Sequence, residues 1–98
     1  MNLSNHQQAL ILNLCQKVLK KTPFEVYIFG SKATGTDHRS SDLDLFIKSQ
    51  NEIDLSIMCT LKELFENSDL PFHVDLIDYF HISGELRKSI LENSVRLI

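Results

Sequence analysis

Several features that mark specialised classes of protein are missing from this 98-residue chain. It has no tryptophan and only three glycines and two prolines, and it contains no internal repeat, low-complexity segment or linker. Its two cysteines, Cys15 and Cys59, lie far apart in helical patterns, so we expect buried, reduced thiols and no disulfide framework. No basic segment leads into an apolar stretch, as in a signal peptide, and no run approaches the roughly 20 apolar residues of a membrane helix. These absences favour a soluble cytoplasmic protein.

An excess of positive charge is also missing. The net charge is -3, so the approach of a nucleic acid would be opposed, and we do not expect nucleic acid to be the main partner. Apolar residues make up 43% and charged residues 23% of the chain, which is an ordinary globular composition. We expect one domain, residues 1–98, that is large enough to bury a core without disulfides.

The pattern of apolar residues predicts an α/β (α+β) fold, with a small three-stranded mixed sheet and helices packed on it. Ser4 and Gln7 form a capping-box pattern at the start of the first helix. The predicted helices cover residues 4–20, 51–67 and 83–93, with a helical turn at 31–34, and the predicted strands cover 24–29, 42–48 and 72–77. Residues 35–41 form a predicted loop, and 95–98 a short apolar tail.

The second predicted strand carries two acids, in the sequence SDLDLFIK. Side chains alternate between the two faces of a sheet, so Asp42 and Asp44 share a face while Leu43, Leu45 and Ile47 point to the core. Two carboxylates so close together repel each other, and burial makes each charge more costly. A divalent cation offsets that repulsion directly, and carboxylate oxygens suit Mg²⁺ or Mn²⁺.

The third predicted strand, FHVDLI, repeats this pattern. Asp75 points away from Val74 and Leu76, which face the core, while Asp78 is expected to be a surface or capping acid. If the second and third strands are neighbours, three carboxylates converge. Three acids fit a pair of metal ions bridged by a carboxylate and a substrate phosphate, as in phosphoryl-transfer sites.

A turn at Gly30 and Ser31 ends the first predicted strand. Such a turn aims backbone N–H groups and a hydroxyl at one point, which suits a phosphate. Lys32 and Arg39 are further candidates for a phosphate contact, the alternative being a solvated loop. The segment from Gly30 also reads like a P-loop, but Thr36 stands where the P-loop lysine belongs, which argues against that class.

The combined stretch GSKATGTDHRSSDLDL resembles the signature of the DNA polymerase beta-like nucleotidyltransferase superfamily. Within it, the whole chain is similar to the minimal nucleotidyltransferases, which are encoded beside a HEPN-domain toxin as its antitoxin. The resemblance implies a polymerase beta-like core, with Asp42, Asp44 and Asp75 as catalytic acids and ligands of Mg²⁺ or Mn²⁺. It also implies that Gly30 and Ser31 contact the phosphates of a nucleoside triphosphate.

Positions 32 and 34 depart from the arginines that the family often has there. Lys32 keeps the positive charge for a phosphate contact but lacks the planar fork of arginine, and Thr34 has neither.

The function implied is transfer of AMP from ATP to a tyrosine hydroxyl of a HEPN toxin, which neutralises the toxin. Residues 1–98 leave no room for a second domain that would grip a small acceptor, which favours a protein acceptor. One alternative is a non-catalytic antitoxin or binding subunit that neutralises its partner by forming a complex. Another is the substrate-recognition subunit of a two-chain transferase of the antibiotic-modifying type.

Overall fold

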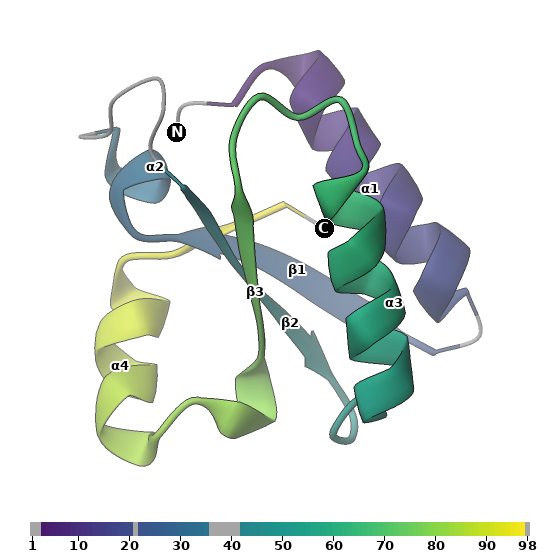
Figure 1. Cartoon of the computed structure of the whole chain (residues 1–98). Helices are drawn as coiled ribbons and strands as arrows, with labels where there is room; N and C mark the ends of the chain where they lie inside the picture. The colour runs from purple at the N-terminus through teal and green to yellow at the C-terminus, as the bar shows by residue number, and fades with distance from the viewer. Residues whose placement is uncertain (1–2, 21, 36–41, 98) are drawn as a thin grey trace.

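A mixed four-stranded sheet organises the chain, with strand order β3-β2-β1-β4. The computed structural model describes residues 3–20, 22–35 and 42–97 (Figure 1). Strand β1 pairs antiparallel with β2 and with β4, whereas β2 and β3 are parallel. The elements in chain order are α1 (Asn5–Leu19), β1 (Phe24–Phe29), α2 (Ser31–Thr34), β2 (Leu43–Ser49), α3 (Leu55–Glu66), β3 (Val74–Asp78), the 3₁₀ turn η1 (Tyr79–His81), α4 (Gly84–Glu92) and β4 (Val95–Arg96).

The α+β class and the mixed sheet were predicted correctly, but the prediction of three strands was wrong. The segment expected to be an apolar tail forms the edge strand β4, in which Val95 pairs with Ile28 and Arg96 pairs with Tyr27. The Leu97 N–H then donates to the Val26 carbonyl at 2.8 Å. A strand of two residues is too short to show an alternating pattern, so only its pairing with β1 reveals it.

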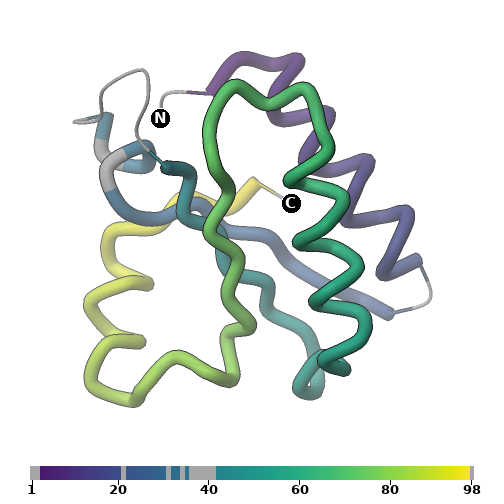
Figure 2. The backbone as a smooth tube through the Cα atoms, viewed as in Figure 1, coloured from purple at the N-terminus to yellow at the C-terminus, as the bar shows by residue number. Residues whose placement is uncertain are grey.

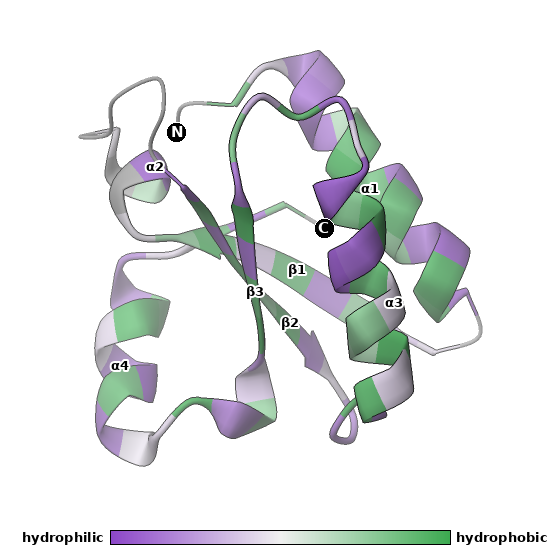
Figure 3. Ribbon diagram, viewed as in Figure 1, coloured by the Kyte–Doolittle hydropathy of each residue, from purple (hydrophilic) through white to green (hydrophobic). Residues whose placement is uncertain are grey.

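One face of the sheet is covered by α1 and α3. The parallel strands β2 and β3 lie side by side, and the chain passes through α3 between them (Figure 2), as a parallel connection requires. Apolar residues run along the strands and along α1 and α3 (Figure 3). The core consists of buried residues from both helices and three strands, including Ile11, Cys15, Met58, Leu61, Val26, Ile28, Leu43, Leu45, Ile47, Val74 and Leu76.

Helix α1 begins as the sequence predicts. The Ser4 hydroxyl accepts a hydrogen bond from the Gln7 N–H at 3.1 Å, and the Gln7 side chain accepts one from the Ser4 N–H at 3.0 Å. This capping box satisfies two backbone donors at the helix N-terminus. Among the described residues, no helix is long and apolar enough to cross a membrane.

The opposite face of the sheet carries an aromatic cluster. Phe46 of β2 is fully buried and stacks on Tyr27 with ring centroids 4.6 Å apart. Phe29 and Tyr79 lie beside Phe46, each with a centroid distance of 5.9 Å. The Arg87 guanidinium of α4 lies 4.8 Å from the Tyr79 ring, so α4 meets this face through a cation–π contact.

Several local predictions needed correction. Cys59 was expected in the core but is exposed on α3, whereas Cys15 is buried. Asp78 was expected to be a surface or capping acid, and it is a cap but a buried one. Its Oδ1 accepts from the Phe80 N–H at 3.0 Å and its Oδ2 from the Ile53 N–H at 2.7 Å. The long predicted helix begins only at Leu55, because the residues before it form the connection that Asp78 holds.

Candidate active site

Gly30 ends β1 and lies against a carboxylate of the neighbouring strand. Its φ of +76° is a conformation that residues with a side chain rarely adopt. A Cβ placed there would also clash with Asp44 Oδ2 and would lie 3.3 Å from Asp44 Cγ. The backbone conformation therefore favours glycine at this position, and any larger residue would have to displace the Asp44 carboxylate, so the turn lies beside Asp44.

Asp44 and Asp75 are partners in the β2–β3 ladder. The parallel register pairs Asp44 with Asp75 and Leu43 with Val74, so the two acids lie side by side on the same face. The predicted convergence of these two acids is confirmed as an arrangement of the strands. Asp42 lies just before β2 and is exposed.

The electrostatics of Asp44 reflect its position near the other two acids. Asp44 is partly buried, and this burial raises the pKa of its carboxyl above the ordinary value of 3.8. The negative charges of Asp75 and then Asp42 raise this pKa further. A positive charge placed among the three carboxylates would reverse this effect by favouring their ionised forms.

The chemistry of these donors fits Mg²⁺ or Mn²⁺, which prefer carboxylate oxygens. Within residues 3–20, 22–35 and 42–97, no group of three or more histidine, cysteine, aspartate and glutamate side chains is arranged as a ready-made metal site. As they lie, the side chains of Asp42, Asp44 and Asp75 are thus not gathered into a three-ligand metal site, and an ion bound there would also take ligands from water or substrate phosphate, as Mg²⁺ commonly does. The assignment of these three acids as metal ligands stays a prediction.

The predicted phosphate contacts divide into two groups. The backbone of Gly30 and Ser31 forms the turn as expected, but the Ser31 side chain and the segment 36–41, which includes Arg39, lie outside the described residues. Lys32 is only 2% exposed, and its Nζ lies 4.4 Å from the centroid of the Phe72 ring. Its ammonium thus joins α2 to the segment before β3 and is engaged in further interactions. A phosphate contact by Lys32 stays a prediction.

Two features near the acids were not found from the sequence. His73 Nδ1 lies 2.8 Å from Glu66 Oε1, which joins the end of α3 to the start of β3. Phe72 provides the ring under Lys32. The Lys32–Phe72 pair joins segments that are distant in sequence, and the Glu66–His73 pair spans the connection from α3 to β3, so no helix or strand pattern could reveal either.

Known proteins with similar sequences include nucleotidyltransferases. Residues 12–98 match the family described as polymerase beta, nucleotidyltransferase. A relative from Haemophilus influenzae (strain ATCC 51907 / DSM 11121 / KW20 / Rd), named a probable protein adenylyltransferase MntA, is 33% identical over 92% of this chain and 77% of its own.

Solved structures have the same fold. A chain of a toxin–antitoxin structure with AMP-PNP has a TM-score of 0.77 and 27% identity, over 93% of this chain and 72% of its own. A chain of a second complex, the tri-AMPylated Shewanella oneidensis HEPN toxin with MNT antitoxin, has a TM-score of 0.69 over 93% of this chain and 68% of its own. At 22% identity this second match shows the fold alone. The match to the family over most of the chain, together with the paired acids beside the Gly30 turn, means that this protein belongs to the polymerase beta nucleotidyltransferase family.

Proposed function

We propose that this protein is an antitoxin that transfers AMP from ATP to a tyrosine hydroxyl of a HEPN toxin. The observation that carries the proposal is the in-register pair Asp44 and Asp75 beside the Gly30 turn, in a chain of a nucleotidyltransferase family. The names of its relatives support the substrate and the acceptor: one is a probable protein adenylyltransferase, and another was solved as a toxin–antitoxin with AMP-PNP. Because ATP is the proposed substrate, we place the reaction in the cytoplasm.

The acids and the turn have different proposed roles, one in binding metal and the other in binding phosphate. We assign Asp42, Asp44 and Asp75 as the residues that would hold Mg²⁺ or Mn²⁺, which when bound would neutralise charge on the phosphates. Gly30 leaves space for a close approach of the backbone, and we assign Gly30 and Ser31, with Lys32 nearby, to the triphosphate. Asp44, in contact with the turn, ties the two parts of the site together.

The reaction requires one proton acceptor. The tyrosine oxygen forms a bond to the α-phosphorus of ATP, the bond from this phosphorus to the oxygen bridging to the β-phosphate breaks, and pyrophosphate leaves. The hydroxyl proton goes to a carboxylate, and we assign this role to Asp75 because it is exposed, whereas Asp44 is partly covered.

Intact-mass spectrometry of a purified HEPN toxin, incubated with this protein, ATP and Mg²⁺, tests the proposal. We expect the toxin to gain mass in steps of one AMP with the wild type and with Asp54→Asn, and to gain none with Asp44→Asn. Asp54 is a matched control because it is exposed and its side chain makes no capping hydrogen bond.

A toxin that remains unmodified by the wild type, yet is neutralised equally well by the wild type and Asp44→Asn, would overturn the enzymatic proposal. That result would identify the protein as a non-catalytic antitoxin that acts by forming a complex.

A further inference from the structure

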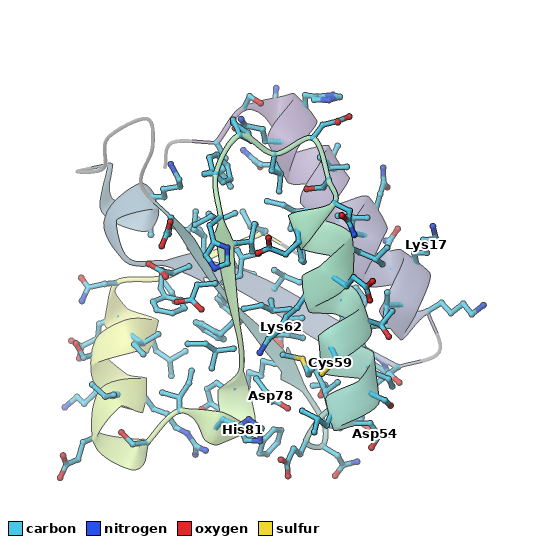
Figure 4. All side chains as sticks on the ribbon, viewed as in Figure 1. Lys17, Asp54, Cys59, Lys62, Asp78 and His81 are labelled. Atoms are coloured by element: carbon cyan, nitrogen blue, oxygen red, sulfur yellow. The ribbon has the colours of Figure 1, made fainter. Side chains whose placement is uncertain are left out.

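A groove runs between α3 and β3 and reaches the candidate active site. It has a volume of about 480 Å³, which is in the range of ligand-binding clefts. Leu55, Met58 and Lys62 of α3 line one side, and the four consecutive residues 75–78 line the other. Figure 4 shows Lys62 extending from α3 toward β3, with Asp78 and His81 near the far end of this strand.

The β3 side of this groove is formed by consecutive residues of the strand. Side chains of a strand alternate between faces, so four consecutive residues line one groove only if the edge of the strand faces it. Leu76 demonstrates this, because its side chain belongs to the core and the residue is 4% exposed, yet it lines the groove. The strand order places β3 at an edge of the sheet in the described part of the chain.

The hydrogen bonds to β2 show which backbone groups face outward. The His73 carbonyl accepts a hydrogen bond from the Leu43 N–H at 2.9 Å, so the backbone groups of His73 point toward β2. In a parallel ladder successive residues direct their N–H and C=O groups to opposite sides. The backbone groups of Val74 and Leu76 therefore point away from β2, and those of Leu76 lie along the groove, where a further strand would find donors and acceptors.

The groove is continuous with the acids. Asp75 lines it and is also the ladder partner of Asp44. A chain lying along β3 would therefore pass directly by the carboxylate to which we assign the acceptor proton. Strands pair at a spacing of about 4.8 Å, whereas a helix with its side chains is about 10–12 Å wide, so the edge of β3 suits an extended segment.

Leu55 gives this groove an apolar side. It is 76% exposed, although it is a large aliphatic residue in the first turn of α3. Lys62, two turns further along α3, adds a positive charge on the same side. The occupant that fits is an extended peptide segment with an apolar side chain near Leu55 and a hydroxyl residue at Asp75.

We propose that the acceptor segment of the HEPN toxin binds as an added strand along β3, in the groove beside α3, with its tyrosine at Asp75. This proposal rests on the proposed function, because the reaction supplies the reason for a tyrosine there. It adds the surface and the conformation by which the protein acceptor is recognised.

Kinetics with a matched pair of leucine variants test the groove. Leu55→Ser should raise the KM for the HEPN toxin about tenfold, since roughly 1.4 kcal/mol of apolar contact is lost, and leave the KM for ATP unchanged. Leu86→Ser is the control, because Leu86 is also an exposed helical leucine, 57% exposed, but lies on α4. Equal KM values for the toxin in the two variants would overturn the proposal.

Hydrogen exchange tests the added strand itself. A toxin with its acceptor tyrosine replaced by phenylalanine forms the complex without turnover, and we expect it to slow exchange at the Leu76 amide. The Phe46 amide of the inner strand β2 is the internal control and should not change. A rise in KM for Leu55→Ser without protection of Leu76 would overturn strand addition.

The two proposals fail in different ways. If the wild type modifies the toxin but hydrogen exchange at the Leu76 amide is not slowed, the groove proposal is wrong and the proposal of AMP transfer is retained. If the wild type does not modify the toxin but Leu76 is protected, AMP transfer falls and the groove is a docking surface of a binding antitoxin.

Discussion

The two faces of β2 carry opposite chemistry on one short segment. Leu43, Leu45 and Ile47 are fully buried under α1 and α3 and form the centre of the core. Asp44, between two of them, turns to the other face and meets Asp75 and the Gly30 turn. Alternation of side chains along one strand thus gives the fold on one face and the candidate site on the other.

The difference shows how carboxylates can be clustered in so small a protein. Repulsion among the acids, and the burial of Asp44, oppose folding on the site face. The apolar residues on the opposite face compensate, because each stabilises the same strand from the other side. Changing one face of β2 at a time tests whether the two faces act independently, and four experiments do this.

The largest effect is expected from Asp44→Asn, which changes only the site face. A carboxylate that would hold the metal ion beside the phosphates stabilises the transition state by several kcal/mol through that ion, so AMP transfer should fall on the order of 10³-fold. The free energy of unfolding should not fall, because a repelled charge is removed. Single-turnover kinetics and urea titration measure the two quantities, and a variant with near-normal transfer would contradict the assignment of Asp44.

The converse change is Leu45→Ala, which alters only the core face. Leu45 is fully buried, and its truncation should lower the free energy of unfolding by about 2–5 kcal/mol. Urea titration measures this loss. For molecules that remain folded, transfer per folded molecule should stay within a few-fold of wild type. A selective loss of transfer at full stability would show that the two faces are not separable.

Gly30 and Gly35 offer a matched pair, because both have positive φ, but among the described residues only Gly30 lies against Asp44. Their φ values are +76° and +77°, and a Cβ on Gly35 would meet no atom of the described residues within 4 Å, whereas one on Gly30 would clash with Asp44. Each alanine variant should lose roughly 1–3 kcal/mol of stability from backbone strain. Gly30→Ala should in addition displace Asp44 and reduce transfer, while Gly35→Ala retains it. Thermal melts measure the stability of both variants, and transfer assays measure their activity. Equal transfer by Gly30→Ala and Gly35→Ala would contradict the prediction that the clash displaces Asp44.

The smallest effect concerns pH. The raised pKa of Asp44 means that the folded state binds a proton more tightly than the unfolded state does. This stabilisation is fully present below the ordinary pKa of 3.8 and is lost as the pH rises through the folded value. In EDTA, Asp44→Asn should therefore melt slightly above wild type at pH 7, and the difference should shrink toward pH 4. Mg²⁺ should raise the Tm of the wild type more than that of the variant; a variant that melts lower at pH 7 would contradict this sign.

Local patterns were enough to predict much of this molecule. The capping box at Ser4 and Gln7 marks α1, and the alternation around Asp44 assigns both faces of β2. The convergence of Asp44 with Asp75 depended on one further condition, that β2 and β3 be neighbours, which the ladder satisfies.

Features that depend on distant contacts were not predictable. Asp78 is buried because Ile53, 25 residues away in sequence, donates to it, and Lys32 is buried because the Phe72 ring lies over it. The edge strand β4 exists only through its pairing with β1. In each case the physical cause is a partner brought in by the tertiary fold, which the residues nearby in sequence do not reveal.

The register of β2 against β3 links the proposed activity to correct folding. If β3 slipped by one residue, Asp75 would lie opposite Leu43 or Leu45 and its carboxylate would turn toward the apolar layer. Such a chain would have the same composition and nearly the same secondary structure, yet its acids would never meet. Under the proposed function, a newly synthesised molecule would therefore become active only when its strands are correctly aligned, and a mispaired molecule would be inactive and not merely less active.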